Sequence, residues 1–137
     1  MLRRMIELHD SKVAGIQKIG NQLIVFFSKA YVHQSKGEPG RDAGSGWVQA
    51  AALVFAEGMA VGDGIAEWPA DIWDGHLVVE GVLLNNQIPV PFEEAGKVEL
   101  RLQLDTPAEV TVRGRGVCLR MLGDPVYVEE FPGARAG

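Results

Sequence analysis

The chain has 137 residues, of which 47% are hydrophobic and 23% are charged, and its formal net charge is −5. That length is typical of one domain, covering 1–137, and the acidic balance argues against nucleic-acid and anionic-membrane partners, since both need a basic patch. The single cysteine excludes an internal disulfide, and no run is apolar enough for a signal peptide or a membrane span, so we expect a bacterial cytoplasmic protein.

Glycine and proline punctuate the whole chain. Seventeen glycines and seven prolines lie between short apolar runs, a pattern typical of strands joined by tight turns. We therefore predict an all-β fold of about eight to ten short, mainly antiparallel strands, which form a barrel or a two-sheet sandwich.

The N-terminal part reads as three strands. Strands are expected at 4–8 and 13–19, with a turn at His9-Asp10-Ser11 between them, because Asp and Ser side chains bond nearby backbone groups. Gly20-Asn21 then predicts a hairpin turn into the longest strand, 22–33.

The middle of the chain is less regular. Residues 34–46 are rich in glycine and in charges of both signs, which predicts a mobile loop. A strand at 47–55 follows. Glycines interrupt 56–75, where one helical turn is expected at 65–68 or at 70–73.

Alternation returns in the last part. Strands 76–84 and 87–92 are expected to form a hairpin around Asn85-Asn86, and Pro89 and Pro91 mark a protected sheet edge. Residues 97–104 alternate apolar and polar side chains, as a half-buried strand does. The remaining expected elements are strands at 109–113, 117–122 and 126–130, a turn at Gly123-Asp124-Pro125, and a frayed tail at 132–137.

One group of residues suggests binding. Tyr31 and His33 end a predicted strand, the loop 34–46 follows, and the chain returns at Trp47. Loops carried by rigid strands often hold binding residues. We predict a binding surface made of Tyr31, His33, Trp47 and the loop residue Arg41.

No catalytic, metal or cofactor site is predicted. His9, Asp10 and Ser11 are the residue types of a hydrolase triad, but the side chains of adjacent residues diverge. His33 and His76 lack the short spacing that metal ligands usually show.

Several short segments carry a resemblance. They are Leu8-His9-Asp10-Ser11, Ala30-Tyr31-Val32-His33, Gly75-His76-Leu77, Ile88-Pro89-Val90-Pro91, and the end from Gly114 to Phe131. With them the chain resembles a family of small uncharacterised bacterial all-β proteins with an N-terminal Leu-His-Asp-Ser segment. The resemblance implies no activity and no catalytic residue.

The function favoured by these observations is a non-catalytic binding or interaction domain with a protein partner. The size and acidic charge of the chain are similar to those of immunity proteins that neutralise toxins, an analogy at the level of composition alone. Two alternatives remain open: a β-barrel that binds a small ligand, and an enzyme whose site residues are dispersed along the sequence.

Overall fold

The computed structural model describes residues 2–63, 67–106 and 108–132. The described residues form nine strands in one antiparallel sheet and no helix, so the all-β prediction is confirmed. In that part of the chain, no helix is long and apolar enough to cross a membrane. The strands are β1 (Arg3–Ile19), β2 (Gln22–Ser35), β3 (Gly44–Phe55), β4 (Met59–Asp63), β5 (Ala70–Val79), β6 (Val82–Asn85), β7 (Gln87–Val90), β8 (Glu93–Leu104) and β9 (Glu109–Phe131).

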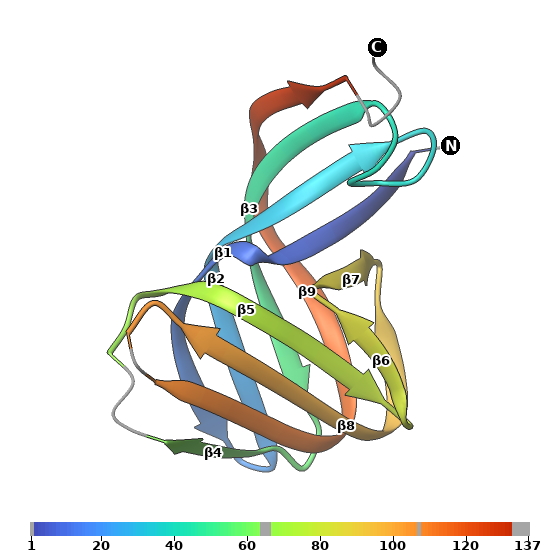
Figure 1. The fold of residues 1–137 in the computed structure, drawn as a ribbon. Coiled ribbons are helices and arrows are strands. Elements are labelled where there is room, and N and C mark those ends of the chain that lie inside the picture. The colour runs from blue at the N-terminus through green and yellow to red at the C-terminus, as the bar shows by residue number, and fades with distance from the viewer. Residues whose placement is uncertain (1, 64–66, 107, 133–137) are drawn as a thin grey trace.

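Six strands close into a ring of hydrogen bonds. Its order is β1-β2-β3-β9-β8-β5, and β5 returns to β1 through the pairs Lys12–Asp71 and Val13–Ala70. Because this closure spans two residue pairs, the ring has features of both a barrel and a sandwich. The short strands β4, β6 and β7 pair with β9, β5 and β1 at its margins (Figure 1).

The ring encloses the hydrophobic core. Strand β8 shows how the sequence builds it, because Val98, Leu100, Leu102 and Leu104 are buried while the residues between them are more exposed, as the alternation predicts. Other inward residues come from the remaining ring strands: Leu8, Val13, Val25, Phe27, Leu53, Phe55, Ile72, Leu77 and Val112. Each large side chain of this kind stabilises the fold by about 1.5–3 kcal/mol.

Strands β1, β2, β3 and β9 lose register with one another along one row of the sheet. This row pairs Ala30 of β2 with Gln49 of β3. Opposite Ala30, β1 inserts residues 8–11, and opposite Gln49, β9 inserts residues 123–125. The predicted turns at His9-Asp10-Ser11 and Gly123-Asp124-Pro125 are therefore wrong: these polar, turn-forming residues make bulges inside continuous strands.

Ser11 fills the gap that the first bulge leaves. Its hydroxyl donates to the carbonyl oxygen of Glu7 at 2.7 Å and accepts from the backbone N–H of Tyr31 at 3.0 Å. Ser11 is 2% exposed, so water does not readily replace these bonds. The Ser11 hydroxyl thus takes the place of a direct backbone hydrogen bond between β1 and β2.

Two amide side chains complete the hydrogen bonding along this row. The backbone N–H groups of Leu8 and His9 donate to the carbonyl oxygen and the Oδ1 of Asn86, both at 2.7 Å. On the other side, Nε2 of Gln49 donates to the carbonyl oxygen of Gly123 at 2.8 Å. Asn86 and Gln49 therefore provide partners for backbone groups that the bulges leave unpaired across the ladder.

The predicted hairpin of 76–84 with 87–92 is also wrong. The chain reverses earlier, at Glu80 and Gly81, whose φ angles are 46° and 79°, and β5 pairs with β6. Asn86 has a positive φ of 64°, as expected for asparagine, but it redirects the chain so that β7 pairs with β1. Pro89 does lie in an edge strand, since β7 ends the strand order.

The middle of the chain also departs from expectation. The helical turn at 70–73 is wrong, because these residues begin β5, and residues 65–66 of the alternative turn lie outside the described part. The loop expected at 34–46 is shorter, covering 36–43, because β2 and β3 extend into both of its ends. Residues 133–137 of the expected tail are likewise outside the described part.

We predict that Ser11→Ala destabilises the fold by about 1–3 kcal/mol, because it leaves a buried N–H and a buried carbonyl without a hydrogen-bond partner. Urea unfolding at neutral pH measures this. The matched control is Ser28→Ala, which removes an exposed hydroxyl from β2 and should change stability by no more than about 0.5 kcal/mol. Equal effects of the two substitutions would contradict the bridging role of Ser11.

Candidate binding surface

Beyond the row at Ala30 and Gln49, four strands leave the ring together. The same sheet continues there, and this projecting part, which we call the arm, consists of residues 3–7 of β1, 31–35 of β2, 44–48 of β3 and 126–131 of β9, with one bulge at Val128 (Figure 1). Strand β7 lies along its β1 side, and the C-terminal part of β9 forms its other margin.

One face of the arm carries two polar side-chain pairs. Nε2 of His33 lies 2.5 Å from Oε2 of Glu7, which joins β2 to β1. The hydroxyl of Tyr31 donates to Oε1 of Glu129 at 2.6 Å, which joins β2 to β9. His33 is 8% exposed, and its ring lies between those of Tyr31 and Phe131, with centroids 5.0 and 4.9 Å away.

Glycine at position 46 makes the second pair possible. Strand β3 lies between β2 and β9, so Tyr31 must cross it to reach Glu129. A Cβ at Gly46 would collide with the hydroxyl of Tyr31 and press on the ring of Phe131. The absence of a side chain at this position therefore allows a direct contact between β2 and β9.

An amide and a second carboxyl group lie beside the His33–Glu7 pair. Oε1 of Glu7 accepts from Nδ2 of Asn86 at 3.3 Å. Partial burial and then the nearby charge of Glu7 raise the pKa of Asp10. Nδ1 of His33 is buried and has no hydrogen-bond partner among the described residues. These groups form a polar cluster that links β1 and β2 with Asn86, the residue between β6 and β7.

The structure separates the predicted binding residues. Tyr31 and His33 share one face, as expected, but Trp47 lies on the other, where it pairs with Val32 and packs against Tyr127 at 5.4 Å between ring centroids. The grouping of Trp47 with Tyr31 and His33 did not take into account that alternate residues of paired strands point to opposite faces of the sheet.

The fourth predicted residue, Arg41, lies in the loop 36–43. Its side chain is exposed, and Nη1 is 3.5 Å from Oε2 of Glu38. Internal bonds shape the loop, including that from the backbone N–H of Glu38 to Oδ2 of Asp42 at 2.7 Å, and Pro39 is buried. Arg41 is therefore exposed to solvent, with its guanidinium beside Glu38 of the same loop.

The sequence interpretation missed the margin of the arm formed by β9. Val126, Tyr127 and Val128 are 60%, 49% and 44% exposed. Three consecutive apolar residues with this exposure show that both faces of this strand segment contact solvent. The signal was present, because an apolar run directly after Pro125 is typical of an edge strand.

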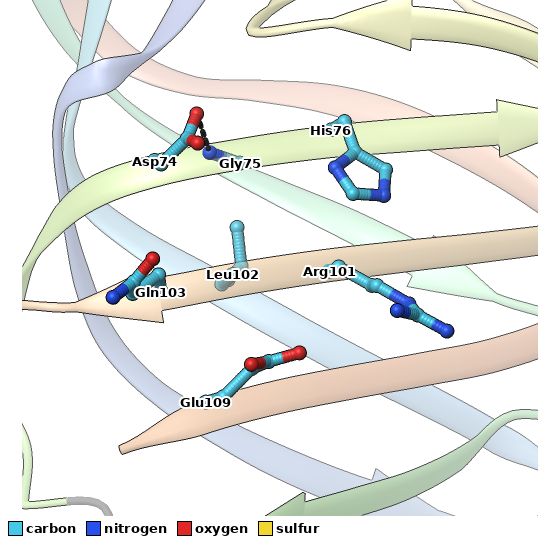
Figure 2. Close-up of a pocket in the computed structure, with 7 residues that line it drawn as sticks. All are labelled: Asp74, Gly75, His76, Arg101, Leu102, Gln103 and Glu109. Atoms are coloured by element: carbon cyan, nitrogen blue, oxygen red, sulfur yellow. Dashed lines mark hydrogen bonds between the residues drawn. The ribbon is translucent and has the colours of Figure 1, made fainter. Parts of the chain in front are cut away.

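A second feature is a shallow hollow of about 120 Å³ on the outside of the ring (Figure 2). Asp74 and His76 of β5, Arg101 of β8 and Glu109 of β9 line it. The carboxylate of Asp74 accepts from the N–H of Gly75, as the dashed line shows. Arg101 bonds instead to Glu99, so its guanidinium is already engaged by a carboxylate.

The histidines lie apart in the structure. Nδ1 of His9 contacts the carbonyl oxygen of Trp73 at 2.5 Å, His33 contacts Glu7, and His76 lies at the hollow on β5. Within the described ranges, no three His, Cys, Asp or Glu side chains form a group that could hold a metal ion.

Comparison with known proteins finds no match: no family model, no curated protein and no solved structure is similar to this chain.

We predict that folding stability falls as the pH rises above about 10, and that Tyr31→Phe makes this fall shallower. Burial, the hydrogen bond to Glu129 and its charge raise the pKa of Tyr31 above the ordinary value of 10.0. Above that pH the unfolded chain loses the phenol proton while the folded chain retains it, so the unfolded state gains stability.

Urea unfolding between about pH 8 and pH 11 tests this difference in slope. The other tyrosine, Tyr127, is present in both proteins, so its contribution to the comparison cancels. Identical slopes for the wild type and the variant would show that Tyr31 ionises equally in the folded and unfolded chains.

Proposed function

We propose that this protein is a non-catalytic binding domain for a protein partner and that the arm carries its binding surface. The observation that carries the proposal is the exposed apolar segment Val126-Tyr127-Val128 at the margin of a projecting sheet. Contiguous exposed apolar side chains on a sheet edge are a common basis of protein association. The proposal includes the bacterial cytoplasmic setting expected from the sequence.

The arm fits this role better than the exposed apolar residues of the marginal strands β4 and β6. Val82 and Leu83 of β6 are also exposed, as is Met59 of β4. These residues lie on strands of four and five residues. The β9 segment ends a strand of 23 residues, and the Tyr31–Glu129 contact attaches it to β2. A partner therefore meets a more extended and better anchored surface on the arm.

We predict that Val126→Ser combined with Val128→Ser weakens partner binding at least tenfold, or about 1.4 kcal/mol. The partner is first captured by the wild-type protein from cells of its source and then purified, and its affinity is measured by calorimetry. Because both valines are exposed, the change should alter stability by less than about 1 kcal/mol.

The matched control is Val82→Ser combined with Leu83→Ser, which removes two comparably exposed apolar side chains from β6. It should retain the affinity of the wild type. A partner that binds the arm variant and the wild type equally well would contradict the proposed function.

A further inference from the structure

The C-terminal part of β9 has one free side. Residues 126–131 pair with β3 on their inner side. On the other side, the contacts of β9 with β8 end near Cys118, and the N–H of Leu119 donates to the carbonyl oxygen of Phe92. Across the described residues, no strand pairs with the outer side of 126–131. At about 3.4 Å per residue, this outer edge is about 20 Å long.

This edge has only part of the usual protection against strand pairing. Edge strands are commonly blocked by lysine, by proline or by bulges. Pro125 and Pro132 flank the segment, and β9 has a bulge at Val128, between the pairs Gly46–Glu129 and Trp47–Tyr127, but 126–131 itself contains neither proline nor lysine. On the opposite margin of the arm, β7 does contain Pro89. The strand at one margin of the arm therefore contains a proline, whereas residues 126–131 at the other margin contain none.

The charge of the segment indicates which kind of strand fits. Residues 121–132 contain Asp124, Glu129 and Glu130 and no lysine or arginine. An antiparallel second copy would bring four glutamates into one short ladder, between two chains that each carry a net charge of −5. A strand with lysine or arginine would instead meet complementary charge.

A hollow that ends at Pro125, next to the start of the edge, can receive one of the partner's side chains. Its volume is about 130 Å³, and its lining is Arg4, Val32, Gln34, Trp47, Gln49 and Pro125. Because Arg4 lines it, it suits an uncharged side chain of the partner. Peptides that extend a sheet gain affinity from backbone hydrogen bonds and specificity from pockets that receive side chains. The edge offers backbone groups for hydrogen bonds, and the hollow offers a pocket for a side chain.

We propose that the outer edge of β9, residues 126–131, binds an extended basic segment of a protein partner as an added strand. This inference rests on the proposed function and specifies how the arm binds. The partner's backbone continues the ladder of the arm, and its lysine or arginine side chains lie near Glu130, whose side chain is exposed.

The test uses a synthetic peptide of alternating lysine and threonine, acetylated and amidated, added to isotope-labelled protein. We expect saturable binding with a Kd below about 1 mM, chemical-shift changes centred on 122–131, and slower hydrogen exchange at alternate amides of 126–131. A peptide N-methylated at alternate amides should bind at least tenfold more weakly, as should a peptide with glutamate in place of lysine.

A charge reversal on the protein completes the test. Glu130→Lys should weaken binding of the lysine peptide at least fivefold, whereas Glu94→Lys, which reverses an exposed charge on β8, should have no effect. Equal binding of the N-methylated peptide, or no binding of the lysine peptide, would overturn strand addition by a basic segment. Sedimentation as a dimer with these edge amides already protected would show that a second copy occupies the edge, and would overturn it too.

The two proposals fail separately. If the lysine peptide gives none of these effects but the Val126 and Val128 variant still loses the cellular partner, the arm binds in another way and the proposed function stands. If that variant keeps full affinity for the cellular partner, the proposed function itself is wrong.

Discussion

The requirement that buried backbone groups keep hydrogen-bond partners governs the row where the long strands lose register. Strands of 17 and 23 residues belong to both the ring and the arm, and they bend where residues are inserted between the two. Each insertion leaves backbone groups without a partner across the ladder. Ser11, Asn86 and Gln49 supply those partners from side chains or from a neighbouring turn. The division into ring and arm depends on them.

Polar side chains then give the arm its rigidity. In the ring, apolar side chains hold the strands together around one core, whereas a projecting sheet has fewer neighbours to pack against. The Glu7–His33 and Tyr31–Glu129 pairs link β2 with both β1 and β9, and Gly46 makes room for the second link. A margin fixed in this way loses less conformational entropy when a partner pairs with it than a flexible strand would.

Sequence reasoning was most successful where one residue's environment follows from its neighbours along the chain. The alternation of 97–104 predicted which side chains of β8 are buried, and the hairpin at Gly20 joins β1 to β2 as expected, with a φ of 60°. It failed at His9-Asp10-Ser11 and Gly123-Asp124-Pro125. The same residue types favour turns and bulges, and the choice depends on whether the flanking segments stay paired with the same neighbour.

The candidate site shows the same division. By itself, the sequence determined that the fold is all-β, that Tyr31 and His33 lie on one face of a strand, and that Pro89 belongs to an edge, because each follows from local backbone geometry. The tertiary structure alone decided that Trp47 lies on the opposite face, that Glu7 and Glu129 reach His33 and Tyr31, and that the end of β9 has a free side. Strand neighbours are set by pairings between residues far apart in the chain, and no local pattern specifies which strand lies beside which.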